Sequence, residues 1–352
     1  MKTPTIYKVD LKDPDFSKIR QIALESRAGK VVVFPTETVY GVGGPLGASG
    51  LAERLVQIKG RPDQKPFAYH IGEWEMLDGL HIKQTAVFRH LARKFWPGPV
   101  TLIAEGSDGI KTGIRFPKNR IATALIQSAG EPFIATSANP SGGKSPYTAD
   151  EAAQGLAGAF DILIDGGPCE YSNDSTVVDV SGAEPVIVRE GAMIDEVKKE
   201  IAAVKAGEFV RKRILVVCTG NSCRSPMAEG LLLDELRKKG LDKQIEVNSC
   251  GIAARIGAKA TQEAILVMKN IEVDISQHRS KPCTRDHVSQ ADLILAMAKE
   301  HADFIFNQMP QARPKTRVMN VVDPIGMGML IYEAVLMDIQ KKMKDLWSEI
   351  AA

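Results

Sequence analysis

The stretch that decides the fold of the second half of the chain is ILVVCTGNSCRSP, residues 214–226. The apolar run 214–217 predicts a buried strand, and Pro226 stands where proline commonly opens a helix. Between them lies a loop of small residues. Its backbone N–H groups, together with the positive end of the following helix, suit a phosphate dianion. The segment therefore predicts a strand, an anion-binding loop and a helix in direct succession.

Two side chains of this loop predict nucleophilic chemistry at phosphorus. Cys218 at the strand end would point its sulfur at the phosphorus atom, and Arg224 would bind two equatorial oxygens. The helix N-terminus, the guanidinium and the Ser225 hydroxyl each favour the thiolate, which is the reactive form of cysteine. Cys223 has two interpretations: a partner of Cys218 in a reversible protective disulfide, or a small buried thiol.

The rest of the chain predicts two α/β domains. Further strand candidates follow the loop at 245–249, 293–297 and 317–321. Because helical segments separate them, residues 213–352 are expected to form a doubly wound parallel sheet. Upstream, short β-branched runs alternate with helical patterns and predict an α/β sheet domain over residues 1–195. The charged stretch 196–212 has a helical pattern but few large apolar residues, and it is expected to be a linker.

Composition limits the class of protein. A chain of 352 residues with 44% hydrophobic and 25% charged residues can build two ordinary cores. The formal charge of +2 is too small for binding nucleic acid through bulk electrostatics. The N-terminus has no apolar leader and no run is long enough to span a membrane, so we expect a cytoplasmic protein without membrane contact. Five cysteines without a CxxC pair indicate reduced thiols.

The segment CTGNSCRSPMAEG at 218–230 resembles the signature of low-molecular-weight protein phosphatases, and the likeness runs from about Arg213 to the last residue. The resemblance implies that Cys218 is the nucleophile, that Arg224 binds the phosphate, and that Asp323, in Asp323-Pro324, protonates the leaving group and then activates water. It implies no cofactor or metal for this domain. The implied phosphate loop also contains Thr219, Gly220, Asn221, Ser222, Cys223 and Ser225.

The substrate of the second domain stays open at this point. Arsenate reductases with a similar loop use two further cysteines, and the corresponding stretch 293–299 has none, although Cys250 and Cys283 keep that alternative in play. Family tyrosine phosphatases usually carry a branched apolar residue in place of Ser222 and tyrosines after the Asp-Pro, whereas Ile-Gly-Met stands at 325–327 here. A small hydroxylated residue at 222 is closer to the protein-arginine phosphatases. We therefore expect a phosphoprotein substrate carrying phosphoarginine or phosphotyrosine.

In the first domain the polar chemistry is spread over several segments. Strand ends rich in hydroxyls and glycine let a ligand approach the backbone. The dense basic turn that contains KGRP suits a triphosphate. A cluster of solvated surface charges would give the same sequence pattern. Arg115 and the polar loop after residue 135 add a cation and hydroxyls at successive strand ends. The motifs, in order, are PTETVYG (35–41), KGRP (59–62), WPGPVT (96–101), SANPSG (137–142), STVVD (175–179) and REGA (189–192).

Together these motifs resemble the YrdC-type threonylcarbamoyl-AMP synthases over roughly residues 5–195. The resemblance implies a twisted mixed sheet with helices that condenses threonine, bicarbonate and ATP into threonylcarbamoyl-AMP and pyrophosphate. The product feeds threonylcarbamoyladenosine formation in tRNA, so tRNA or the modifying transferase is an expected partner, and Mg²⁺ is expected to accompany ATP. Implied threonine-binding residues are Thr36, His70, Arg115, Ser137 and Ser175, and implied ATP-binding residues are Lys59, Arg61, Asn139, Ser145 and Arg189.

The resulting hypothesis is a bifunctional enzyme. No residue of the first domain looks like a covalent nucleophile, so catalysis there is expected from positioning and charge neutralisation. The sequence context of His70 departs from the more aliphatic run of many relatives, and a core histidine is its other interpretation. Two alternatives remain: a first domain that only binds RNA or nucleotide, and a second domain that resembles arsenate reductases.

Overall fold

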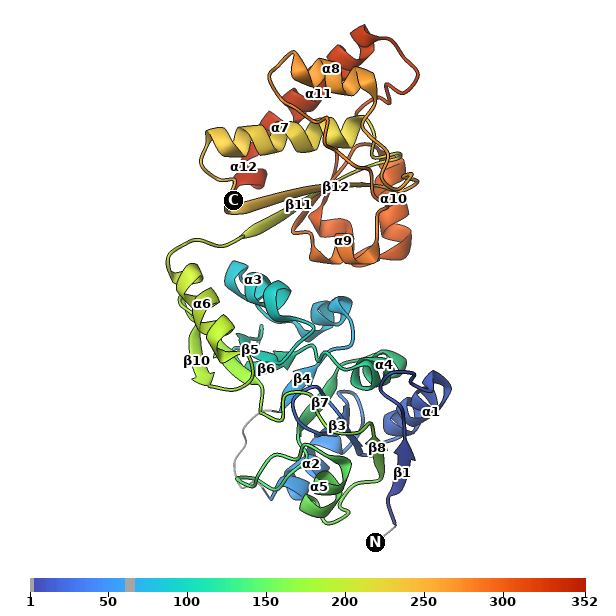
Figure 1. Ribbon diagram of the computed structural model, residues 1–352, viewed down its shortest axis with the longest axis vertical. Helices are drawn as coiled ribbons and strands as arrows, with labels where there is room; N and C mark the ends of the chain where they lie inside the picture. Colours follow the sequence, from blue (N-terminus) through green and yellow to red (C-terminus); the bar gives the residue numbers. More distant parts are fainter. Residues whose placement is uncertain (1–2, 61–66) are drawn as a thin grey trace. The chain divides into compact units, whose positions relative to one another are not determined.

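The computed structural model describes residues 3–60 and 67–352. The chain divides between Gly207 and Glu208 into two compact units, shown in blue to green and in yellow to red in Figure 1. Each unit has its own sheet.

The described residues of the first unit form one ten-stranded mixed sheet with the order β1-β8-β2-β3-β7-β4-β6-β5-β9-β10. The sheet contains parallel pairs such as β1 with β8 and antiparallel pairs such as β2 with β3, which confirms the predicted mixed sheet. The strands are β1 (Thr5–Lys8), β2 (Val32–Phe34), β3 (Gly41–Pro45), β4 (Ala68–His70), β5 (Val100–Glu105), β6 (Lys111–Arg115), β7 (Phe133–Ser137), β8 (Ile162–Asp165), β9 (Thr176–Asp179) and β10 (Val186–Arg189).

Side-chain caps start several helices of the first unit. Asp15 accepts a hydrogen bond from the Lys18 backbone N–H at 3.0 Å, and Asn119 caps a later helix in the same way. Such caps satisfy N–H groups that have no partner within the helix. The helices are α1 (Phe16–Arg27), α2 (Leu51–Lys59), α3 (Ala86–Phe95), α4 (Arg120–Ala129), α5 (Ala149–Gly155) and α6 (Ile194–Lys205), with a 3-10 helix η1 at Trp74–Leu80.

Most of the segment expected as a linker is helix α6. Its residues Val197, Ile201 and Val204 are buried, and His90 on α3 contacts Glu200 on α6 at 2.6 Å. Valine, isoleucine and valine at spacings of four and three form one apolar face, which is enough to hold a helix whose other residues are charged. The helix therefore belongs to the first unit, and the connection to the second unit is shorter than the stretch 196–212.

The second unit is a parallel four-stranded sheet with the order β12-β11-β13-β14, which confirms the predicted doubly wound architecture. Its strands are β11 (Lys212–Cys218), β12 (Ile245–Gly251), β13 (Leu293–Ala296) and β14 (Thr316–Val318). Its helices are α7 (Arg224–Lys238), α8 (Gln262–Lys269), α9 (Arg285–Gln290), α10 (Lys299–Gln308), α11 (Met329–Asp345) and α12 (Trp347–Ala351), with a 3-10 helix η2 at Pro310–Lys315.

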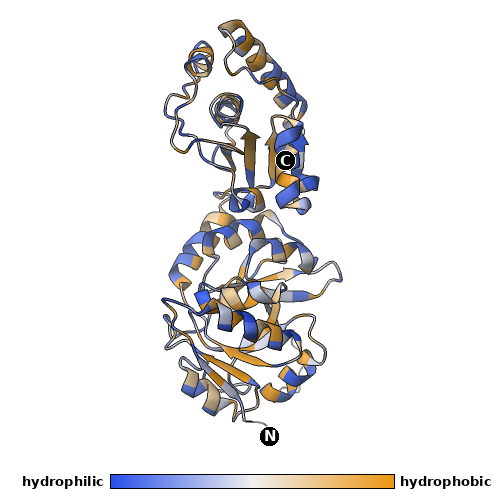
Figure 2. Ribbon diagram, turned by 90° about the vertical axis from the view of Figure 1, so that its right-hand side faces the viewer, coloured by the Kyte–Doolittle hydropathy of each residue, from blue (hydrophilic) through white to orange (hydrophobic). Residues whose placement is uncertain are grey.

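Alternate residues of β11 face two separate cores. Ile214 and Val216 pack with α7, α8, α11 and α12, whereas Leu215 and Val217 pack with α9 and α10. Figure 1 shows these helix groups on opposite sides of the sheet, and Figure 2 shows its strands largely in the hydrophobic colour. A strand that is buried on both faces needs an unbroken apolar run, which is what residues 214–217 supply.

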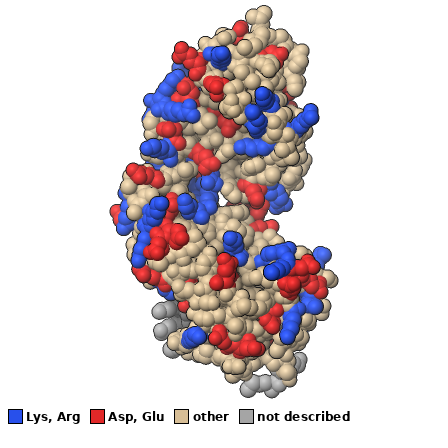
Figure 3. Space-filling model, viewed as in Figure 1, with Lys and Arg blue, Asp and Glu red and all other residues tan. Residues whose placement is uncertain are grey.

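The surface carries both signs of charge. On the face shown in Figure 3, Lys and Arg side chains are interspersed with Asp and Glu side chains over both units. In the part of the chain that the structure describes, no helix combines the length and apolar character needed to cross a bilayer.

We expect Leu295→Ala to lower the free energy of unfolding of the second unit by about 3 kcal/mol, because it opens a cavity in a strand buried on both faces. Leu295 is 0% exposed, whereas Leu266 on α8 is 50% exposed. Leu266→Ala is therefore the matched control and should cost less than about 1 kcal/mol. Urea denaturation, followed by hydrogen exchange in each unit, measures both free energies of unfolding. An equal loss of unfolding free energy in the two variants would contradict the two-core arrangement.

Candidate active sites

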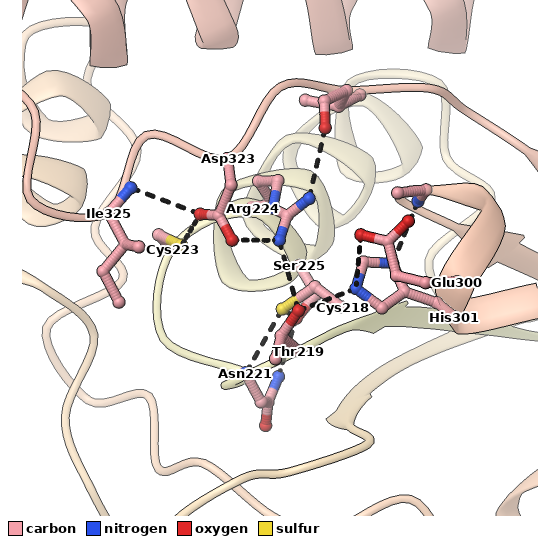
Figure 4. A network of polar contacts seen from close by, with 12 residues as sticks. Cys218, Thr219, Asn221, Cys223, Arg224, Ser225, Glu300, His301, Asp323 and Ile325 are labelled. Atoms are coloured by element: carbon pink, nitrogen blue, oxygen red, sulfur yellow. Dashed lines mark hydrogen bonds and ion pairs between the residues drawn. The ribbon is translucent and has the colours of Figure 1, made fainter. Parts of the chain in front are cut away.

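Cys218 is the last residue of β11, and its thiol is completely buried. The Asn221 backbone N–H donates to its sulfur at 3.2 Å, and the Ser225 Oγ lies 3.0 Å from the same atom (Figure 4). The Ser225 oxygen also accepts a hydrogen bond from the Asn221 side-chain amide, and a thiolate at Cys218 would take the Ser225 proton, because a thiolate has none to donate. These contacts place donors where a negatively charged sulfur needs them.

Asn221 holds the loop in shape. Its backbone has a positive φ of 53°, a left-handed conformation that asparagine tolerates better than most residues. Its side-chain amide donates to the hydroxyls of Ser225 at 2.9 Å and Ser249 at 2.8 Å, and its oxygen accepts from the Lys281 backbone N–H at 2.9 Å. The ring of His278 bonds its carbonyl at 2.8 Å. The loop is thus fixed by residues from three separate segments.

Arg224 opens helix α7 with a side chain that is 2% exposed. It donates to the Val321 carbonyl at 3.2 Å, and it forms an ion pair with the carboxylate of Asp323. The Asp323 carboxylate also accepts hydrogen bonds from the Ile325 backbone N–H at 3.2 Å and from the Cys223 thiol at 3.7 Å. The structure therefore places Cys218, Arg224 and Asp323 around one loop, with the guanidinium paired to the Asp323 carboxylate.

The other predicted loop residues lie around this centre. Ser222 and Thr219 are half-buried, and the Ser222 carbonyl accepts from the Thr261 backbone N–H at 2.8 Å. A side chain on Gly220 would lie 3.1 Å from the Ser222 hydroxyl, which is tighter than an ordinary contact. Burial, together with the adjacent charge of Cys218, raises the pKa of Cys223 to about 11, so this residue is a neutral thiol at physiological pH.

Two contacts of the second unit are not predicted from the sequence. His301 on α10 lies 2.9 Å from the Thr219 hydroxyl, with no local pattern that identifies it. Cys250, at the end of β12, interacts with Cys283, and this hydrogen bond and burial raise the pKa of the Cys250 thiol. Both cysteines are reduced. They lie together on the core side of the sheet that faces α9 and α10.

In the first unit, Lys59 joins two of the predicted motifs. The Lys59 side chain is almost completely buried and its ammonium donates to the Ser137 carbonyl at 2.8 Å and to the Asn139 carbonyl. Ser137 ends β7, where it is paired with Gly41 of the adjacent strand. The Asn139 amide donates to the Gly143 carbonyl at 2.6 Å, which closes the polar loop. A buried cation is thus held beside hydroxyl and amide groups at the end of a strand.

A second cluster forms where β9 begins. Arg189 donates to the Ser175 carbonyl at 2.8 Å and to its hydroxyl at 2.9 Å, and the Thr101 hydroxyl lies 2.9 Å from the Ser175 hydroxyl. Nearby in sequence, the Ser145 hydroxyl donates to Asp174 at 3.0 Å. Burial lowers the pKa of Arg189; Asp174 raises it and Arg115 lowers it further. Arg189 therefore lies within electrostatic range of Arg115.

A buried ion pair forms the third cluster. Arg115 lies 2.9 Å from Glu37, and the two side chains are 5% and 1% exposed. His70 is the register partner of Arg115 between β4 and β6. Burial and the charge of Arg115 lower the pKa of His70 to about 3, so this ring is neutral. Glu37 is not among the residues predicted from the sequence, although it lies within the PTETVYG motif; its partner is distant in sequence.

Thr36 and Arg61 are the predicted residues that remain. The Thr36 hydroxyl donates to the Val39 carbonyl at 2.6 Å and accepts from the N–H groups of Thr38 and Val39, so it closes a tight turn. Arg61 lies outside the described residues.

Among the described residues, no group of three or more His, Cys, Asp or Glu side chains is arranged to hold a metal ion.

Two family models match the chain over separate ranges. The Sua5/YciO/YrdC model, described as telomere recombination, matches residues 25–191. The model for low molecular weight phosphotyrosine protein phosphatase matches residues 213–352. The two ranges do not overlap, and each falls within one compact unit.

Individual relatives agree with these matches. The threonylcarbamoyl-AMP synthase of Pyrococcus abyssi is 37% identical over 198 residues, which cover 53% of this chain and 58% of that protein. A putative threonylcarbamoyl-AMP synthase of Mycobacterium tuberculosis is 32% identical over 192 residues, covering 52% of this chain and 88% of that protein. The chain thus spans little more than half the length of its Pyrococcus and Bacillus relatives. The solved YwlE arginine phosphatase from Geobacillus stearothermophilus is 33% identical, covers 39% of this chain and 92% of that protein, and has a TM-score of 0.36.

The pKa of His70 predicts an acid-dependent loss of stability in the first unit. An unfolded chain binds a proton on this ring as the pH falls below the ordinary value of 6.5, whereas the folded unit resists protonation down to about 3. Stability should therefore fall as the pH drops through this window. His70→Gln should reduce the slope of unfolding free energy against pH between 6.5 and 4. Parallel slopes for the two proteins would contradict a neutral buried ring.

Proposed function

Because the chain belongs to the Sua5/YciO/YrdC family over residues 25–191 and to the low-molecular-weight phosphatase family over residues 213–352, we propose that it carries two separate enzymatic activities. The first unit forms threonylcarbamoyl-AMP, and the second hydrolyses a phosphorylated protein through a cysteinyl-phosphate intermediate. The observation that supports the second activity most strongly is that Cys218, Ser225 and Arg224 lie in one loop and that Asp323, from a distant segment, pairs with Arg224 there.

In the first unit, the proposed reaction has two steps. The threonine amine and bicarbonate give the carbamate and water, and a carbamate oxygen then attacks the α-phosphorus of ATP with loss of pyrophosphate. Arg115 would pair with the threonine carboxylate, because a guanidinium binds a carboxylate through two parallel hydrogen bonds. Lys59, which is buried, and Arg189, which is exposed, would neutralise the phosphates, because each cation is held beside hydroxyl or carbonyl groups of the proposed site.

Mg²⁺ would accompany ATP at this site, because this ion is usually bound through substrate phosphates and water with few protein ligands. Arg61, Thr36, Ser145 and the other residues predicted from the sequence complete the proposed threonine and ATP sites. The product would be passed to tRNA through a modifying transferase.

In the second unit, Cys218 would attack the phosphorus atom while Asp323 protonates the departing group. The phosphorus–sulfur bond forms as the bond to the leaving atom breaks. Asp323, now ionised, would take a proton from water, which attacks phosphorus and releases phosphate and the thiolate. Arg224 and the backbone N–H groups of the loop would hold the equatorial oxygens throughout.

We propose phosphoarginine as the preferred substrate over phosphotyrosine. Ser222 places a small hydroxyl in the loop, and the segment after Asp323 supplies Ile325 and Met327, both exposed, in place of an aromatic wall. A flat phenol ring gains much of its binding from stacking on aromatic side chains, and these are missing from the 325–327 segment. Arsenate reduction is the second candidate, because Cys250 and Cys283 interact with each other.

For the first activity, Arg115→Lys should raise the KM for threonine about ten-fold or more, because it keeps the charge opposite Glu37 but loses the two-pronged hydrogen bond. The KM for ATP should change little. Pyrophosphate release that requires threonine, bicarbonate and ATP together measures both values. The matched control is Lys111→Ala on the same strand, where the side chain is 58% exposed. Nucleotide binding that ignores threonine would instead favour a module that only binds RNA or nucleotide.

For the second activity, Cys218→Ser should abolish phosphate release from phosphoarginine and phosphotyrosine peptides of one sequence, because oxygen replaces the nucleophilic sulfur. Cys223→Ser should retain release in the presence of a thiol reductant. A higher kcat/KM for the phosphoarginine peptide is expected. A higher value for phosphotyrosine would overturn the substrate proposal, and no Cys218-dependent release from either peptide would overturn the phosphatase.

A further inference from the structure

His301 is a buried histidine beside the phosphatase loop to which the mechanism above assigns no role. It lies in the first turn of α10, its side chain is 0% exposed, and its ring points toward Thr219 (Figure 4). Thr219 directly follows the nucleophile in the chain. The polar atoms of a ring buried this deeply are normally satisfied by neighbouring groups, and those groups determine which ring nitrogen carries the proton.

The contacts of His301 determine its tautomer. The Ala298 backbone N–H donates to Nδ1 at 2.9 Å, so Nδ1 carries a lone pair and the proton of the neutral ring is on Nε2. Nε2 lies 2.9 Å from the Thr219 hydroxyl oxygen and donates to it. Burial, followed by the charge of Arg224, lowers the pKa of His301, which keeps the ring neutral. The Glu300 carboxylate, 3.9 Å from Nε2 and mostly exposed, is too far away to take this hydrogen bond.

The Thr219 hydroxyl therefore accepts two hydrogen bonds. The first comes from His301, and the second from the Arg224 guanidinium at 3.4 Å. A hydroxyl has two acceptor positions and one proton, so an oxygen that accepts twice is left with a donor. Thr219 is half-buried, and its hydroxyl lies beside the guanidinium to which the phosphoryl group is expected to bind. The acceptor best placed to receive its proton is a phosphoryl oxygen.

We propose that His301 is a positioning residue of the phosphatase centre, which orients the Thr219 hydroxyl as an additional hydrogen-bond donor to the phosphoryl group on its way to and from Cys218. This inference rests on the proposed phosphatase function. It explains why a polar ring is buried against the loop, whereas a role limited to capping α10 would need only the contact between Nδ1 and Ala298.

Two substitutions separate the positioning role from the capping role. The side-chain oxygen of Asn can take the place of Nδ1, so His301→Asn keeps the acceptor for the Ala298 N–H and loses the donor to Thr219. The side-chain nitrogen of Gln reaches the place of Nε2, so His301→Gln keeps the donor and loses the cap. A matched control is His287, which accepts a hydrogen bond from the Thr284 backbone N–H in the first turn of α9 and has no described contact with the loop.

With p-nitrophenyl phosphate as substrate, His301→Asn should lower kcat about ten-fold or more, the loss expected for one hydrogen bond to a charged group. Thr219→Val should give a similar loss, and the double variant should lose no more than either single variant. His301→Gln should retain clearly more activity than His301→Asn. His287→Asn should match the wild type. Thermal unfolding of each variant identifies any that fail to fold, and Thr219→Val then carries the test because its side chain is half-buried.

Full activity of His301→Asn, equal damage from Asn and Gln, or multiplied losses in the double variant would overturn the proposal. Binding of inorganic phosphate, measured by calorimetry, tests it independently of turnover. Affinity should fall in His301→Asn and Thr219→Val and should be largely kept in His301→Gln. An inactive wild type would overturn the proposed function, and the phosphate affinities would still decide the role of His301.

Discussion

The phosphatase centre depends on the left-handed backbone of Asn221 and on the hydrogen bonds that hold it there. Strand β11 delivers Cys218 and helix α7 delivers Arg224, but the two side chains face one phosphoryl group only if the intervening loop keeps its N–H groups directed inward. Asn221 secures that shape through Ser225, Ser249 and the backbone of Lys281. The cost of an unusual φ is offset because the hydrogen bonds are buried and come from separate segments.

The first unit must also hold charged side chains in fixed orientations. It contains no comparable single loop in the described residues, and its cations are spread over strand ends where carbonyls and one carboxylate hold them. Arg115 against Glu37 is the most deeply buried of these pairs. A buried pair gains little stability in itself, because desolvation offsets the attraction, but it keeps a guanidinium in a fixed orientation. A substrate carboxylate that takes the place of Glu37 would find that orientation already formed.

Local patterns in the sequence predict local structure well. The run 214–217 lies within β11, and Cys218 and Arg224 stand at the end of that strand and at the start of α7, while their roles stay predictions. Contacts between distant segments have no such signature: His301 and Thr219 are 82 residues apart, and nothing near either residue indicates the other. The charged stretch of α6 is predicted to be a linker, whereas three buried apolar residues give it one packed face within the first unit. Thr36 is predicted from the sequence to bind threonine, whereas in the structure its hydroxyl donates a hydrogen bond within its own turn.

In the proposed phosphatase reaction, Cys218 receives the phosphoryl group and Asp323 is needed to remove it. The most direct measurement is phosphorus NMR and peptide mass analysis of the Asp323→Asn chain after rapid mixing with p-nitrophenyl phosphate, whose leaving group needs no acid. We expect a phosphoryl group on the sulfur of Cys218 that persists longer than in the wild type. A phosphoryl group on another residue, or release of phosphate at the wild-type rate without accumulation on Cys218, would contradict it.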